Sequence, residues 1–438
     1  MPTPHARPEG QGAPAGDLPA GASSVDARSA GGQPAAGDYP TSIASPPKDP
    51  DTVGLILTGG GARAAYQVGV LKAVVQILQE RPGGLTHNPF PVICGTSAGA
   101  INASALACGA YDIAATVDRM LQVWEHFHAE QVYRADALGV MRTGARWLSM
   151  LSFGWMLARL GRLKPRSLLD NRPLGDLLTR MLDFPALADN LRHGAVQALA
   201  ISASSYTTGQ HITFYQSAYE IEPWRRTQRL ACRTTLTVDH LLASSAIPFV
   251  FPAHRVPVFG TAEWCGDGSM RQLAPISPAI HLGANKVLVI GAGRMHEPAR
   301  AAPVPNAYPS VAQIAGHALS NIFLDSLAVD VERLERINQT LALLPADRRT
   351  GSDLRPVKVL VIAPSQRLDD IASRHTASLP PSIRGLLGGI GVSSRTGDPR
   401  GAALASYLLF EPGYTRELIA LGFGDTLSRR SDVIDFFD

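Results

Sequence analysis

One serine of the chain stands between two glycines, in the segment Gly95–Gly99 with the sequence Gly-Thr-Ser-Ala-Gly. The residues before it, Val92 to Cys94, predict a buried strand, and the residues after it predict a helix. A Gly-x-Ser-x-Gly sequence between a strand and a helix is typical of a nucleophile elbow, a tight turn that exposes the serine hydroxyl. We therefore predict that Ser97 is a nucleophile and that Gly95 and Gly99 keep its turn free of bulky side chains.

Three consecutive glycines, Gly59, Gly60 and Gly61, follow a predicted strand at 53–58 and precede a predicted helix at 64–80. Glycines let backbone N–H groups approach a negative ligand closely, and a helix N-terminus adds positive potential. Acyl transfer needs such donors for its oxyanion, and the loss of one donor costs about 3–4 kcal/mol. If the two strands are adjacent and parallel, these amides lie beside the serine.

A nucleophilic serine needs a base, and the sequence offers two kinds. In a Ser–Asp–His order, His281 or His317 could follow Asp267. Neither has a distinctive sequence context, and in a chain with 12 histidines one downstream of Asp267 is expected by chance. Asp267 lies between Gly266 and Gly268, which allows a neighbouring backbone to approach closely. An exposed Asp with a pKa of about 3.9 is a poor base, so burial would have to raise its pKa. The alternative for Asp267 is an ordinary Asp-Gly turn.

The glycine loop also matches the dinucleotide fingerprint GxGxxG/A at Gly59, Gly61 and Ala64. That motif requires an acidic residue at the end of a second strand, whereas Glu80 falls at the end of the first predicted helix. A phosphate-binding P-loop is less favoured still, because no Lys-Ser or Lys-Thr follows the glycines. A nucleotide-binding module without enzymatic activity is therefore the weakest of the alternatives.

These motifs together resemble the patatin-like phospholipase family. The resemblance rests on Gly59–Arg63, Gly95–Gly99 and Asp267-Gly268, and on Ala243–Pro252, which is similar to the segment before the family's catalytic Asp. It covers about residues 53–292. The chain departs from the family pattern at Ser269, where the family has Gly or Ala.

The resemblance implies a three-layer α/β/α fold with a mostly parallel central sheet and a catalytic dyad of Ser97 and Asp267 without histidine. Ser97 would attack the ester and Asp267, supported by Gly268, would take its proton. The amides of the glycine loop would hold the oxyanion, with Arg63 bracing that loop. No metal or cofactor is required for this chemistry.

The implied substrates are acyl esters of phospholipids or lysophospholipids. A soluble esterase, a thioesterase or a polyester hydrolase with the same dyad is the alternative, because pocket walls set the substrate. The stretch Trp147–Leu163 combines aromatic, Met and Arg residues and suits a lipid interface, with a buried helix pair as an equal alternative. Peripheral contact with a membrane surface is compatible with the sequence.

The chain has 438 residues, of which 45% are hydrophobic and 18% are charged, with a formal net charge of +3. This composition predicts a globular protein, and the small charge without basic clusters argues against nucleic acid as a partner. The N-terminus lacks the pattern of a Sec signal peptide, and the charge-free stretch Pro91–Tyr111 contains the serine turn rather than a spanning helix. We expect a cytoplasmic protein without a transmembrane helix.

The order of the predicted elements divides the chain into three parts. Residues 1–50 are rich in Ala, Gly, Pro, Ser and Asp and predict a disordered leader. Strand–turn–helix units in succession predict a parallel sheet covered by helices within an acyl hydrolase domain at 53–292. Residues 303–438 predict a helix-rich extension packed on the core, with a helix break near Gly422–Gly424. Further strands are expected at Val196–Ala203, His211–Tyr215, Lys286–Ile290 and Val357–Ile362.

Overall fold

A computed structural model describes residue 49 and residues 51–134, 167–295, 308–321, 326–345, 354–393 and 401–438. The predicted leader, apart from Asp49, and the stretch Trp147–Leu163 lie outside the described residues. The division into domains therefore stays a prediction.

Ten strands form one sheet, in the order β10-β9-β1-β2-β3-β4-β6-β5 with the hairpin β7–β8 joined to β3. Their bounds are β1 Val53–Leu57, β2 Val92–Thr96, β3 Ala198–Ser205, β4 His211–Ser217, β5 Arg225–Arg226, β6 Arg229–Arg233, β7 His254–Val258, β8 Thr261–Asp267, β9 Lys286–Ile290 and β10 Lys358–Ile362. The pairs from β10 through β3 are all parallel, and so is β4 with β6.

Helices occupy most of the remaining described residues. Their bounds are α1 Ala65–Gln79, α2 Ala98–Cys108, α3 Ile113–Glu125, α5 Arg172–Met181, α6 Phe184–Arg192, α7 Val238–Ser244, α8 Ser277–His281, α9 Val311–Ser320, α10 Ser326–Leu343, α12 Leu368–His375, α13 Pro381–Gly389, α14 Ala402–Ser406, α15 Pro412–Ser428 and α16 Arg430–Phe437.

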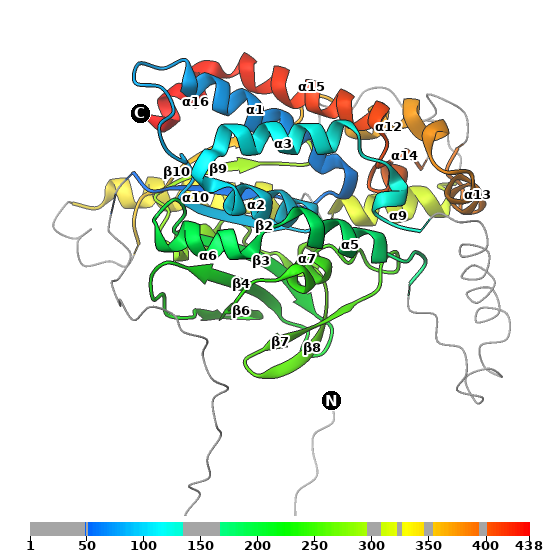
Figure 1. Ribbon diagram of the computed structural model, residues 1–438, viewed down its shortest axis with the longest axis horizontal. Helices are drawn as coiled ribbons and strands as arrows, with labels where there is room; N and C mark the ends of the chain where they lie inside the picture. Colours follow the sequence, from blue (N-terminus) through cyan, green and yellow to red (C-terminus); the bar gives the residue numbers. More distant parts are fainter. Residues whose placement is uncertain are drawn as a thin grey trace, which may run out of the picture. The chain divides into compact units, whose positions relative to one another are not determined.

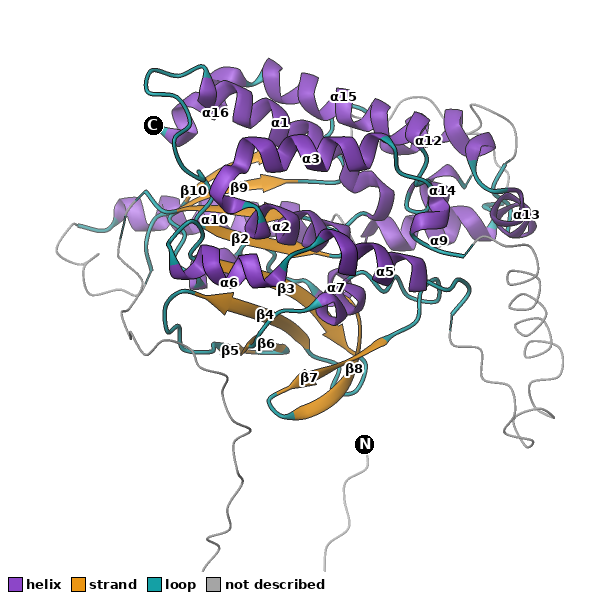
Figure 2. Cartoon of the chain, viewed as in Figure 1, coloured by secondary structure: helices purple, strands orange, loops and turns teal. Residues whose placement is uncertain are grey.

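The sheet separates two apolar cores, because successive side chains of a strand point to opposite faces. Leu55 and Leu57 of β1 pack into the core shared with α1, α2 and α3, whereas Ile56 packs into a core shared with α8 and α10. Helices therefore cover both faces of the strands (Figures 1 and 2). The predicted three-layer α/β/α fold with a mostly parallel sheet is confirmed.

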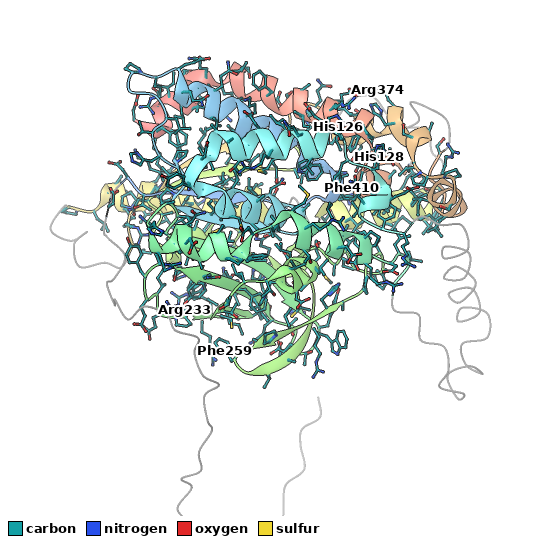
Figure 3. The ribbon with its side chains drawn as sticks, viewed as in Figure 1. His126, His128, Arg233, Phe259, Arg374 and Phe410 are labelled. Carbon is teal, nitrogen blue, oxygen red and sulfur yellow. The ribbon has the colours of Figure 1, made fainter. Side chains whose placement is uncertain are left out.

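The hairpin β7–β8 and strand β6 were not expected from the sequence. The hairpin turn, Phe259-Gly260, has φ values of 46° and 83°, as a type I′ turn requires at its two central residues. Asn or Asp usually precedes Gly in such turns. With Phe259 at that position, the sequence did not predict a hairpin here. Figure 3 shows Phe259 at the free end of the hairpin.

The chain beyond residue 303 extends the same sheet and covers the same core. Strand β10 pairs with β9, and α15 lies along α1 (Figure 1). The predicted break near Gly422–Gly424 is wrong, because α15 continues to Ser428. Gly422 is instead a point of close helix packing: a Cβ there would overlap the carbonyl oxygen of Tyr66 in α1.

No single helix among the described residues is long and apolar enough to cross a membrane. The helix pair Ala98–Cys108 and Ala110–Glu125 meets that test only when taken together, and it is bent by 76°.

Two glycines of α15 allow the helix packing to be tested with a matched pair of variants. Gly422→Ala should lower the free energy of unfolding by about 1–3 kcal/mol, because the added methyl group forces α15 away from α1. Gly424→Ala meets no atom within 4 Å and should raise stability by up to about 1 kcal/mol through helix propensity. Urea unfolding of both variants measures the difference, and equal stabilities would contradict this account of the packing.

Candidate active site

Strand β3 brings the predicted nucleophile and the predicted base together. Thr96, the last residue of β2, pairs with Ser202 of β3, and Asp267, the last residue of β8, pairs with the next residue, Ala203. Strand β4 occupies the other edge of β3, so β2 and β8 meet end to end on one edge. Ser97 follows β2 directly and therefore lies beside Asp267.

The turn at Ser97 has the strained backbone of a nucleophile elbow. Ser97 has φ 54° and ψ −130°, a conformation that costs a non-glycine residue about 1–3 kcal/mol. A Cβ at Gly95 would lie 2.5 Å from the Cα of Ala100, and a Cβ at Gly99 would overlap the carbonyl oxygen of Leu57. The flanking positions thus exclude any side chain, and the predicted roles of both glycines fit this packing.

Ser97 and Asp267 share a short hydrogen bond inside the protein. The Ser97 hydroxyl donates to Oδ2 of Asp267 at 2.6 Å, and the Ser269 N–H donates to Oδ1 at 2.9 Å. Asp267 is fully buried, and this burial raises its pKa from 3.8 to about 6, although both hydrogen bonds act to lower it. A Cβ at Gly268 would overlap the carbonyl oxygen of Ser202, so the residue after the base must be glycine.

Two residues at the end of α7 and just after it, Ser244 and Ala246, hold the backbones of Ser97 and Asp267 in place. The Ser244 hydroxyl accepts the N–H of Ser97 at 2.8 Å and donates to the carbonyl of Ser202 at 2.6 Å. The carbonyl of Ala246 accepts the N–H of Asp267 at 3.1 Å. No sequence motif assigns a role to Ser244 or Ala246, and only their place in the family-like segment Ala243–Pro252 pointed to them.

Two histidines, His281 and His317, were the candidates for a histidine base. His281 stacks on Trp224 with ring centroids 4.6 Å apart, and His317 is exposed on α9. Neither is among the described residues that line the cavity at Ser97. No sequence pattern singled out His211, a buried residue of β4 that hydrogen-bonds the backbone of Gly268. Burial lowers the pKa of His211 to about 4, so it is neutral at pH 7.

The glycine loop lies at the same cavity as the serine. Gly61 has φ 55° and lines the cavity together with Ser97, and a Cβ there would overlap the carbonyl oxygen of Tyr407. That carbonyl accepts the N–H of Ala62 at 3.1 Å. Among the described residues no backbone carbonyl accepts the N–H groups of Gly59 or Gly60, but of the three glycines it is Gly61 that lines the cavity.

The side chain of Arg63 contacts the C-terminal helices and does not line the cavity. Its guanidinium is buried, and Nε donates to the Ser406 hydroxyl at 2.7 Å while Nη2 donates to Oδ1 of Asp369 at 2.5 Å. The structure therefore places Arg63 among residues of the C-terminal helices, and it holds the loop rather than reaching the serine.

An apolar cavity of about 350 Å³ leads away from Ser97, within the size range of small-ligand pockets. Its floor is α2, where Ile101, Ala105 and Cys108 follow the serine over about 17 Å of helix. One wall consists of three aromatic rings in mutual contact, Trp124, Phe127 and Phe410, with Phe127 edge-on to Phe410. Phe410 is labelled in Figure 3.

The end of the cavity remote from Ser97 is more polar. The exposed side chains of Arg119 and Asp183 border it beside Met181, which is 47% exposed. Ser97 itself is only 1% exposed. The cavity therefore offers an apolar path from the buried Ser97 hydroxyl to a more polar, exposed end. Among the described residues no group of three or more His, Cys, Asp or Glu side chains could hold a metal ion.

The buried carboxyl predicts a pH-dependent effect on stability. Because the pKa of Asp267 is raised, the folded protein binds the proton more tightly than the unfolded chain, and the ionised carboxylate opposes folding above pH 6. Asp267→Asn should remove this cost, up to about 3 kcal/mol at pH 8, and the gain should vanish as the pH falls through 6 towards 4. Urea unfolding of both proteins at pH 8 and pH 4.5 measures it. An Asp267→Asn variant less stable than its parent at pH 8 would contradict the raised pKa of Asp267.

The chain is similar to a known family of phospholipases. A family model described as patatin-like phospholipase matches residues 55–280, and no match was found among curated proteins. VipD from Legionella pneumophila is 14% identical, with a TM-score of 0.31 over 84% of this chain and 67% of that chain. Human GIVD cytosolic phospholipase A2 is 12% identical, with a TM-score of 0.41 over 88% of this chain and 60% of that chain. Since the family model covers more than half of its residues, the chain belongs to the patatin-like phospholipase family.

Proposed function

We propose that the protein is a serine acyl hydrolase that cleaves carboxylic esters of phospholipids or lysophospholipids through an acyl-enzyme intermediate. Ser97 is the nucleophile and Asp267 is its only catalytic partner. The observation that carries the proposal is the 2.6 Å hydrogen bond between Ser97 Oγ and Asp267 Oδ2 at the inner end of an apolar cavity. Membership in the family supports lipid hydrolysis in general.

In the first half of the reaction the Asp267 carboxylate takes the proton of the Ser97 hydroxyl as its oxygen attacks the ester carbonyl. The tetrahedral intermediate carries a negative charge on the former carbonyl oxygen. Donors from Gly59, Gly60 and Gly61 stabilise that charge, with the N-terminus of α2 adding positive potential. As the intermediate collapses, Asp267 returns the proton to the leaving alcohol.

In the second half, water attacks the acyl-serine ester with Asp267 again as the base, and the fatty acid leaves with Ser97 restored. A pKa of about 6 suits both directions of proton transfer near neutral pH. An Asp with an ordinary pKa would hold the proton too weakly to return it efficiently.

The cavity supports an ester with a long acyl chain. Its lining is mainly apolar along α2 and the aromatic wall, and each methylene buried there contributes about 0.8 kcal/mol. An acyl chain that starts at Ser97 and follows α2 ends near the exposed side chains of Arg119 and Asp183, where a longer chain would reach solvent. A panel of lysophospholipids, phospholipids, thioesters and short p-nitrophenyl esters separates lipid hydrolysis from a soluble esterase or thioesterase.

The dyad is tested against a histidine triad by single substitutions. Ser97→Ala and Asp267→Asn should each lower kcat by about 10³-fold or more, because either change removes a group that acts directly on the reacting proton. His281→Ala and His317→Ala should keep most of the activity. Initial rates on a soluble p-nitrophenyl ester, with circular dichroism as the folding control, give the comparison.

The pH–rate profile provides an independent measurement. The rate should fall as the pH drops below about 6, where Asp267 becomes protonated and can no longer accept the serine proton. A folded but inactive histidine variant beside an active Asp267→Asn would refute the dyad.

The acyl cavity is tested at the middle of α2. Ala105→Trp should block the cavity at the middle of α2. Several methylenes of a long acyl chain could then no longer be buried, so kcat/KM for long-chain esters should fall by about 10- to 100-fold. Hydrolysis of p-nitrophenyl acetate should change less than about twofold. Ala188→Trp, at a half-buried position of α6 that does not line the cavity, is the matched control. An unchanged preference for chain length would place the acyl group elsewhere.

A further inference from the structure

The residues that hold the glycine loop lie far outside the part of the chain that matches the family. The match ends at residue 280, whereas the contacts of Arg63 come from Asp369, Ala403, Ser406 and Tyr407. These residues belong to the C-terminal helices α12 and α14 and to the residue after α14.

Two of the three guanidinium nitrogens of Arg63 donate hydrogen bonds to these helices. Nε donates to Ser406 Oγ at 2.7 Å, and Nη2 donates to Asp369 Oδ1 at 2.5 Å and to the carbonyl of Ala403 at 3.3 Å. The guanidinium carbon lies 4.1 Å from the centre of the Tyr407 ring. A planar guanidinium held on its face and its edges has one orientation, which a flexible ammonium could not keep.

The same C-terminal segment also fixes the backbone of the loop directly. The carbonyl of Tyr407 accepts the N–H of Ala62 and lies where a Cβ of Gly61 would have to be. The carbonyl of Tyr407 thus holds the Gly61–Ala62 peptide, and the backbone N–H of Arg63 holds the Gly60–Gly61 peptide by donating to the carbonyl of Gly60 at 3.1 Å.

We infer that Asp369, Ser406 and Tyr407 are positioning residues for the oxyanion donors, and that the C-terminal helices complete the active site. The inference rests on the proposed acyl hydrolase function of Ser97. The donors of Gly59–Gly61 stabilise a charge that exists only in the transition state, so their misplacement should lower kcat and leave KM almost unchanged.

Three variants of the full-length chain test the inference on a soluble p-nitrophenyl ester. Asp369→Asn removes the charge that holds Nη2 and should lower kcat about 10- to 100-fold with KM within about twofold of the parent. Ser406→Ala removes the Nε acceptor and the hydrogen bond from Ser406 to the carbonyl of Ala403, but it leaves the charge of Asp369 in place and should give a smaller loss of the same kind. Asp369→Glu keeps the carboxylate and should restore a large part of kcat.

Asp425→Asn is the matched control in the same C-terminal part. Asp425 of α15 accepts from the Tyr66 hydroxyl and from Ser365, so it joins the C-terminal helices to α1 without touching the glycine loop. This variant should lose thermal stability and keep the kcat of the parent. If Asp369→Asn lowers the melting temperature as Asp425→Asn does but keeps kcat, Asp369 is only structural and the inference is overturned.

Labelling with a fluorophosphonate separates this inference from the proposed function. The phosphonyl oxygen needs the same donors, so the labelling rate of Ser97 should fall in Asp369→Asn together with kcat. A parent protein that is not labelled at Ser97 would refute the proposed function. A parent that is labelled, beside an Asp369→Asn variant labelled at the same rate, would refute only the positioning role and leave the dyad intact.

Discussion

One edge of strand β3 carries two different strands, β2 up to Ser202 and β8 from Ala203 onward. This shared edge determines how far apart the serine and the carboxylate can lie, because neither β2 nor β8 can shift without breaking its ladder with β3. A register shift of one residue in either strand would turn Ser97 or Asp267 to the wrong face of the sheet. The hydroxyl of Ser244 and the carbonyl of Ala246 then hold the last peptide of each strand.

The burial of Asp267 connects stability to chemistry. A carboxylate without a cationic partner is costly inside a protein, and two hydrogen bonds reduce this cost without removing it. The strained backbone of Ser97 adds a second local cost. Two helical layers and a ten-stranded sheet surround both residues, and this packing keeps the costly arrangement in place.

Local patterns were enough to predict the parts of the site that depend on local sterics. Gly95 and Gly99 mark a turn whose neighbours exclude a Cβ, and the alternation of strand and helix predicts the sheet. Ser244, His211 and Asp369 could not be found in this way, because their roles depend on contacts between residues 57 to 306 positions apart. The hairpin β7–β8 was missed for a local reason, since Phe259 stands where an Asn or Asp usually marks the turn.

The close packing of α15 on α1 has a consequence for the order in which the protein folds. Gly422 contacts Tyr66, and Tyr407 contacts the glycine loop, so the first helix and the loop before it are completed by residues near the end of the chain. During synthesis Ser97 leaves the ribosome more than 300 residues before these partners do. Contacts so distant in sequence form late in folding. In a nascent chain, Ala62 and Arg63 therefore lack these contacts until the residues beyond 400 have been translated.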